Sequence, residues 1–174
     1  MSETRHVRPY VLKYCQGRGV DLGCGDEKIT PEAIGVDYAI GYGLADHPET
    51  VADVTCGWEE HLASVPAGSL DYVYSSHLLE DYEDIEPVLR AWVEAVKPGG
   101  YLILYLPMEE LFKQHCEATG QTYNKHHHQN WQSAEDFLAQ LPSWFSEQME
   151  CVEASGVIGV YSFYVVLKKR LGPM

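Results

Sequence analysis

The chain has 174 residues, 45% of them apolar, and its formal net charge is −14 at pH 7. This length predicts one domain over residues 1–174, with enough apolar surface to build a core without metals or disulfides. Only 12 basic residues stand among 26 acidic ones. Proteins that bind phosphate backbones carry clustered Lys and Arg, so we expect no nucleic-acid partner.

The cysteines are odd in number, widely spaced and without a CxxC pair, at positions 15, 24, 56, 116 and 151. This pattern is typical of reduced thiols in a cytoplasm and disfavours a disulfide framework or a zinc site. The first residues lack the apolar stretch of a signal peptide, and no apolar run approaches the ~20 residues of a membrane span. We therefore expect a cytoplasmic monomer or homodimer that has no membrane partner.

Strands and helices alternate along the first half of the chain. A short helix is expected within residues 5–16, after Pro9. Runs of β-forming residues that end at turns predict strands at 19–22, 33–37, 50–54 and 69–75. An amphipathic helix is predicted at 84–96, because its apolar side chains recur on one face with the 3.6-residue period. The segment KPGG at 97–100 ends this helix, since proline cannot continue it.

The second half continues this alternation and then departs from it. Residues 101–106 (YLILYL) are apolar throughout, which suits a central parallel strand that is covered on both faces. Helices are predicted at 108–119 and 133–141, and strands at 148–154 and 160–168. The turn between the last two strands is too short for a parallel crossover. The pattern predicts an α/β fold with a doubly wound, mostly parallel sheet and an antiparallel C-terminal hairpin.

Acidic residues mark the ends of the first three predicted strands. The first strand runs into Asp21–Gly25 (DLGCG), the second ends at Asp37, and Asp53–Val54 ends the third. Ligands of such sheets bind beyond the carboxyl ends of the strands, where glycines let the backbone approach them. A carboxylate at position 37 suits the two hydroxyls of a ribose, and one at position 53 suits an adenine amino group. Each Asp alone is equally well a turn or helix-cap residue.

Several segments resemble, in the same order, the motifs of class I S-adenosylmethionine (SAM)-dependent methyltransferases. They are Asp21–Gly25, Asp37, Asp53, Leu70–Ser76 and the segment VKPGGYLI at 96–103. Residues 76–81 (SHLLED) resemble the small-molecule branch, methyltransferase type 11-like. The resemblance covers residues 17–107 and implies a Rossmann-like, seven-stranded sheet. In that sheet the strand at 160–168 is inserted antiparallel beside the strand at 101–106.

The resemblance also implies a cofactor, a pocket and a reaction. The cofactor is SAM, which leaves as S-adenosylhomocysteine. The implied pocket consists of Asp21, Leu22, Gly23, Cys24, Gly25, Asp37, Tyr38, Asp53, Val54, Ser75 and Ser76. The implied reaction is methyl transfer to a small-molecule acceptor such as a sugar or a phenol. The alternative is a catalytically inactive SAM-binding interaction or regulatory module, and an NAD-dependent oxidoreductase is less favoured.

The spacing after the glycine turn disfavours NAD and shortens the fold. The dinucleotide fingerprint GxGxxG requires a third glycine where this chain has Lys28, and its acid follows after about 20 residues. Here Asp37 follows Gly25 after only 12 (37 − 25). Residues 26–32 (DEKITPE) therefore have no room for the usual first helix. We expect one side of the methionine pocket to lie open, where Lys28, Arg5 or Arg8 would meet the methionine carboxylate unless they are surface charges.

Candidate general bases are histidines near the expected acceptor site. His77 follows the fourth predicted strand, and His126 and His128 belong to the run HHH at 126–128, where this fold usually places an acceptor loop. A packed His77 and a polar surface loop are the alternative interpretations. Relatives often have L-E-H where this chain has LED at 79–81, so that imidazole is missing. Three consecutive histidines cannot all face one way, and we predict no metal site.

Overall fold

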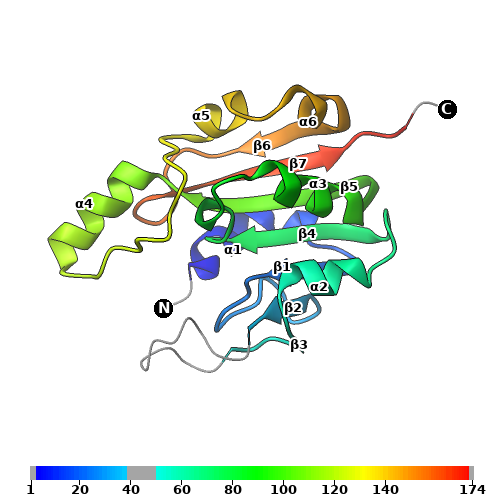
Figure 1. Cartoon of the computed structure of the whole chain (residues 1–174), viewed down its shortest axis with the longest axis horizontal. Coiled ribbons are helices and arrows are strands. Elements are labelled where there is room, and N and C mark those ends of the chain that lie inside the picture. Colours follow the sequence, from blue (N-terminus) through cyan, green and yellow to red (C-terminus); the bar gives the residue numbers. More distant parts are fainter. Residues whose placement is uncertain (1–2, 39–49, 173–174) are drawn as a thin grey trace.

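The computed structural model describes residues 3–38 and 50–172, which form a seven-stranded sheet with helices on both faces (Figure 1). The strands are β1 (Gly19–Leu22), β2 (Ile34–Asp37), β3 (Val54–Thr55), β4 (Leu70–Ser76), β5 (Val96–Pro107), β6 (Met149–Ala154) and β7 (Ser162–Lys169). Their order across the sheet is β3-β2-β1-β4-β5-β7-β6. The predicted Rossmann-like α/β fold is confirmed.

The direction of the strands changes where the sequence predicts it. Strands β1 to β5 pair in parallel, whereas β7 lies antiparallel between β5 and β6. In the β5–β7 pair, Leu104 stands opposite Val165. The insertion of the last strand beside the central apolar strand is therefore confirmed.

The helices cover the two faces of the sheet unequally. Helix α1 (Thr4–Val11) and a 3₁₀ turn η1 (Leu12–Tyr14) cover one face. The other face is covered by α2 (Trp58–Ala63), α3 (Glu86–Ala95), α5 (Ala134–Ala139) and α6 (Ser143–Gln148). Helix α4 (Glu109–Thr119) extends past the carboxyl ends of the parallel strands (Figure 1). A second 3₁₀ turn, η2 (Leu79–Asp81), follows β4.

The unequal cover has its origin in residues 26–32, which form turns and no helix, as predicted. Without the usual first helix, the fully buried Ile29 fills the space against Val7 and Val11 of α1. Arg8 crosses from α1 and donates to the carbonyl oxygens of Lys28 (2.7 Å) and Ile29 (3.0 Å). A side chain thus satisfies backbone groups that a helix would have satisfied internally.

Several boundaries differ from the sequence prediction. Helix α1 begins at Thr4 and contains Pro9, because a proline there removes only one backbone hydrogen bond while Val7 and Val11 bury the apolar face. Strand β3 starts where the third strand was predicted to end, since only Val54 and Thr55 pair with β2. The helices α2 and α6 were not predicted, because six residues carry little periodicity.

No helix in residues 3–38 and 50–172 is long and apolar enough to cross a membrane.

Candidate functional site

The glycine turn after β1 is locked to the end of β2. Gly23 and Gly25 have φ angles of 74° and 53°, which favour glycine. The Asp37 carboxylate accepts hydrogen bonds from the Gly25 amide and from the Tyr38 amide, each at 2.7 Å. The turn that resembles a cofactor motif and the acid expected to bind ribose are therefore in direct contact.

A cavity of about 300 Å³ lies beside this turn. Three of the residues assigned to the cofactor line it, namely Gly23, Asp37 and Tyr38. The remaining lining consists of Val36, Cys56, Gly57, Trp58, Leu78, Asp81, Tyr82 and His126. Two carboxylates and three aromatic rings thus face one space, which suits a neutral or positively charged ligand with a flat ring.

Two aromatic side chains that line this cavity, Trp58 and Tyr82, were not predicted from the sequence. Trp58 donates from its indole nitrogen to the Tyr82 hydroxyl at 2.6 Å and packs edge-on against that ring. Trp58 begins α2, and Tyr82 directly follows the SHLLED segment at 76–81. The SHLLED resemblance was the available signal for Tyr82, but nothing in the sequence placed Trp58 opposite it.

Asp21 lies on the other side of β1 and is fully buried. Its Oδ2 accepts from the Ile29 amide at 2.6 Å, whereas Oδ1 has no hydrogen-bond partner among the described residues. Burial raises the pKa of Asp21 to about 7. Asp21 therefore keeps a free acceptor, Oδ1, at the glycine turn. Because a buried oxygen without a hydrogen bond destabilises the folded chain, a ligand donor is expected there.

The other assigned cofactor residues are mainly structural in their contacts. Leu22 and Cys24 are buried, and Ser75 donates from its hydroxyl to the Leu22 carbonyl at 2.9 Å. Asp53 precedes β3 and does not line the cavity beside Asp37. Its Oδ2 accepts from the Gly35 amide and from Lys28 Nζ, both at 2.8 Å, and Lys28 holds its pKa below the usual range.

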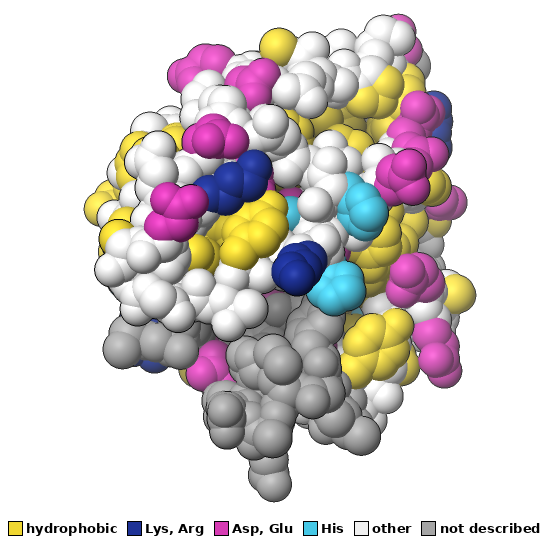
Figure 2. Space-filling model, turned by 60° about the vertical axis from the view of Figure 1, so that its left-hand side comes forward, with side chains coloured by type: hydrophobic (Ala, Val, Ile, Leu, Met, Phe, Trp, Pro, Cys, Tyr) yellow, Lys and Arg dark blue, Asp and Glu magenta, His cyan; other side chains and the backbone are white. Residues whose placement is uncertain are grey.

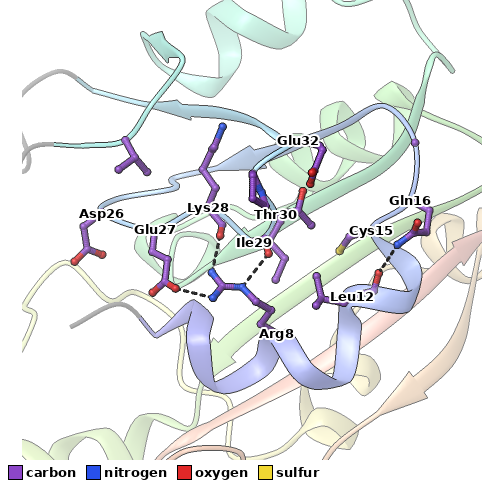
Figure 3. Close-up of a pocket in the computed structure, with 13 residues that line it drawn as sticks. Arg8, Leu12, Cys15, Gln16, Asp26, Glu27, Lys28, Ile29, Thr30 and Glu32 are labelled. Atoms are coloured by element: carbon purple, nitrogen blue, oxygen red, sulfur yellow. Dashed lines mark hydrogen bonds and ion pairs between the residues drawn. The ribbon is translucent and has the colours of Figure 1, made fainter.

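The three basic side chains expected at the methionine end are all paired, and Figure 3 shows the pairing of Arg8 with Glu27. Arg8 reaches from α1 to Glu27 at 2.6 Å, and Arg5 contacts the same carboxylate at 3.4 Å. Lys28 binds Asp53. The structure therefore uses these cations to fix the shortened loop. A second, open cavity of about 1050 Å³ adjoins this loop, with Arg8, Cys15 and Ile29 among its lining.

His77 lies at the end of β4 in a strained backbone conformation, with φ of 51°. Its Nε2 is 3.0 Å from Ser162 Oγ, and its ring meets Tyr105 and Tyr161 edge-on. Burial lowers the pKa of His77 to about 3. The imidazole is neutral at pH 7 but only weakly basic, so its surroundings favour packing over proton transfer.

The run of three histidines divides between solvent and core. His126 and His128 are exposed, and His126 lines the cavity. The His127 side chain, only 4% exposed, points inward, and its Nδ1 lies 2.9 Å from Glu109 Oε2. Its Nε2 lies 4.0 Å from Asp81 Oδ1, so the loop brings an imidazole to the place where the sequence lacks one. The sequence could not show which histidine faces inward.

The loop and α4 lie on the face above the carboxyl ends of the strands. Figure 2 shows this face, on which histidine side chains lie among hydrophobic and acidic ones. Backbone bonds tie the loop to the sheet side of the cavity: the His128 amide donates to the Glu80 carbonyl at 2.8 Å, and the Glu109 amide to the Trp131 carbonyl at 3.0 Å. Among the described residues, no group of three His, Cys, Asp or Glu side chains is arranged to hold a metal ion.

Comparisons with known proteins agree with this geometry. A family model described as a methyltransferase domain matches residues 7–149. A search of curated proteins gave no significant match.

Solved structures share the fold at low identity. A SAM-dependent methyltransferase from Methanosarcina mazei is 15% identical, with a TM-score of 0.59 over 94% of this chain and 98% of that one. One from Thermotoga maritima, for which histamine N-methylation is suggested, is 18% identical, with a TM-score of 0.59 over 97% and 91%. A chain from a Haloferax volcanii complex of the methyltransferase activator Trm112 with a methyltransferase is 16% identical, with a TM-score of 0.62 over 97% and 92%.

Proposed function

This chain belongs to the methyltransferase domain family, and from that premise we propose that it transfers the methyl group of SAM to a small-molecule acceptor. The observation that carries the proposal is the contact between Asp37 and the glycine turn, at the edge of a cavity of about 300 Å³. The family match favours this reaction over the oxidoreductase alternative.

The residues present fit SAM on several counts. Asp37 offers a carboxylate to the ribose hydroxyls, and Tyr38, Trp58 and Leu78 offer apolar surface to the adenine. The free Oδ1 of buried Asp21 is an acceptor for an ammonium group such as that of the methionine end. When bound, SAM supplies a methyl carbon that its sulfonium has already activated.

The contribution of the protein is then positioning and exclusion of water. A methyl transfer proceeds by in-line displacement, so the nucleophile must be held in line with the breaking bond. The rigid tie between loop 124–131 and η2 gives the acceptor side a fixed shape, because Gln129 also donates to the Tyr82 carbonyl at 2.6 Å. The rings of Trp58 and Tyr82 line the same cavity as Asp81 and reduce the access of water to it.

The lining also supports a small acceptor that is not an anion. Asp37 and Asp81 are its carboxylates, and no Lys or Arg belongs to the described lining. Phosphate-rich acceptors require clustered cations, which this lining does not supply.

Calorimetry with SAM, S-adenosylhomocysteine and NAD tests the cofactor. We expect the first two to bind and NAD to show no heat of binding. Release of S-adenosylhomocysteine with a panel of sugar nucleotides, phenols and small amines then tests turnover. Tight NAD binding would contradict the proposal, and SAM binding without turnover on any acceptor would favour a non-catalytic binding module.

A further inference from the structure

Three carboxyl side chains and one imidazole meet behind the cavity wall. We call them the Asp81 cluster: Glu80, Asp81, Glu109 and His127. His127 is central, with Nδ1 2.9 Å from Glu109 Oε2 and Nε2 3.8 Å from Glu80 Oε1 and 4.0 Å from Asp81 Oδ1. Only Asp81 also lines the cavity that Asp37 lines.

In the part of the chain that the structure describes, the carboxyl groups of the cluster have no Lys or Arg partner within hydrogen-bond distance. Glu80 is 1% exposed, and neither of its carboxyl oxygens has a hydrogen-bond partner among the described residues. Burial raises its pKa well above the usual range. Among the described residues, Asp81 accepts a hydrogen bond from a neutral donor, Asn124 Nδ2 at 3.3 Å, and Lys113 lies 3.9 Å from Glu109. Within residues 3–38 and 50–172, Asp81 therefore faces the cavity without a Lys or Arg partner.

We propose that the methyl acceptor is a primary or secondary amine, whose ammonium group binds Asp81, and that His127, oriented by Glu109, is the positioning residue that receives the proton through Asp81. This inference rests on the proposed methyl transfer from SAM and identifies the chemical class of its acceptor.

The charge that develops during transfer distinguishes an amine from a hydroxyl. In amine methylation the positive charge of the sulfonium passes to the acceptor nitrogen, and carboxylates stabilise it there. A hydroxyl acceptor must instead lose its proton, and the same carboxylates oppose the negative charge that deprotonation places on the oxygen. The Asp81 cluster therefore favours an amine.

The proton balance closes within the cluster. Asp81 takes one proton from the bound ammonium, which leaves a lone pair on nitrogen. It passes the proton to Nε2 of His127 when a side-chain movement shortens their 4.0 Å separation to hydrogen-bond distance. The Nδ1–H of His127 donates to Glu109, which stabilises the imidazolium that forms. The nitrogen–carbon bond forms while the carbon–sulfur bond breaks, and its electron pair stays on sulfur. The products are the methylated ammonium, S-adenosylhomocysteine and a proton that His127 later releases to solvent.

Titratable groups from several elements lie near His127. They are Glu80 and Asp81 of η2, Glu109 of α4, His77 after β4, and Tyr123 of the segment that carries His127. The neighbouring His126 and His128 act on Asp81. A pH profile therefore reports on the cluster as a unit.

Matched pairs of amine and alcohol test the acceptor class, for example phenethylamine with 2-phenylethanol and tryptamine with tryptophol. Release of S-adenosylhomocysteine is measured for each, together with calorimetric binding to the S-adenosylhomocysteine complex. We expect amines to bind and react and their alcohols to do neither. Asp81→Asn should weaken amine binding at least tenfold and reduce turnover by about 10²–10⁴-fold. Glu83→Gln, an exposed carboxylate two residues on, is the matched control and should change neither.

His127→Gln and Glu109→Gln test the positioning role. In His127→Gln the glutamine keeps a donor toward Glu109 but takes no proton, and in Glu109→Gln the carboxylate that orients His127 is lost. In each variant kcat should fall about 10- to 100-fold while KM changes little. The limb of the kcat–pH profile that reports proton uptake should shift or vanish. Glu110→Gln, 56% exposed on the next position of α4, should leave the profile unchanged.

The outcomes separate this inference from the function on which it rests. If the wild-type protein did not bind SAM, the proposed methyltransferase function itself would be contradicted. Intact SAM binding with turnover of the alcohols, or of neither member of any pair, would overturn the amine inference alone. Wild-type turnover of an amine by Asp81→Asn would also overturn it.

Discussion

The cofactor side and the acceptor side of this molecule are built in different ways. On the cofactor side, Asp21, Gly23, Gly25 and Asp37 come from 17 consecutive positions (21–37), and a single hydrogen bond of 2.7 Å between Gly25 and Asp37 joins their ends. On the acceptor side, Asp81, Glu109 and His127 come from η2, α4 and a loop, and they meet only in the folded chain. The comparison teaches that a site built from residues close in sequence can be predicted, whereas a site whose residues come from separate elements cannot.

If the two sides are separate structural units, damage to one should leave the other intact. The largest expected effect is on the acceptor side. Trp131 is the last residue of loop 124–131, and its buried ring packs against Phe137. Trp131→Ala removes this ring. We expect a loss of about 3–5 kcal/mol in the free energy of unfolding and a fall in Tm of roughly 6–20 °C.

Chemical denaturation and calorimetry with SAM check this expectation together. SAM affinity should stay within about threefold of wild type, measured below the new Tm. A parallel loss of SAM affinity would show that the two sides are coupled and would break the comparison.

Asp21 provides the next largest effect, as a pH dependence on the cofactor side. Its pKa is about 7 in the folded chain against 3.8 unfolded, so the folded state binds more protons between these values. This raised pKa contributes stability at low pH, and the contribution is lost as pH rises through 7. Asp21→Asn removes this titration. From pH 5 to pH 8, the free energy of unfolding of Asp21→Asn should therefore rise by about 2–3 kcal/mol relative to that of the wild type.

Urea unfolding of both proteins across that range measures this gain, and the difference between the two curves isolates Asp21 from other groups. A constant difference would mean that the Asp21 carboxyl titrates alike in the folded and unfolded states.

Asp37 should matter for binding more than for folding. Asp37→Ala removes the carboxylate that holds the glycine turn and faces the cavity. The loss of hydrogen bonds to such a group costs about 1.5–3 kcal/mol, which is roughly a 10- to 150-fold loss of SAM affinity. Calorimetry measures it, with the exposed Glu32→Ala as control. Unchanged affinity with an intact circular-dichroism spectrum would remove Asp37 from the site.

The smallest effect concerns the shortened loop. Arg8→Ala leaves the Lys28 and Ile29 carbonyls without their donor, and we expect about 1–2 kcal/mol of destabilisation. Arg5→Ala is the matched comparison, because Arg5 contacts the same Glu27 but is 45% exposed, and it should change stability by less than about 0.5 kcal/mol. Equal effects of the two variants in urea unfolding would show that Arg8 acts through charge alone.

The sequence prediction succeeded where a signal repeats or is local. The 3.6-residue period found α3, and the short turn before β7 predicted its antiparallel direction. Prediction was poorest for short elements whose ends depend on partners. Strand β3 starts at Val54 because its pairing with Val36 decides the register, and that pairing turns Asp53 toward Lys28.

By itself, the sequence determined the family, the sheet and the acid at the end of β2, because each depends on neighbouring residues or on apolar periodicity. Only the tertiary structure decided which histidine of 126–128 faces inward. A loop residue has no fixed periodicity, so its direction is set by what it meets. Here Glu109 of α4 holds Nδ1 of His127 at 2.9 Å, while the backbone bond from His128 to Glu80 fixes the loop beside Asp81.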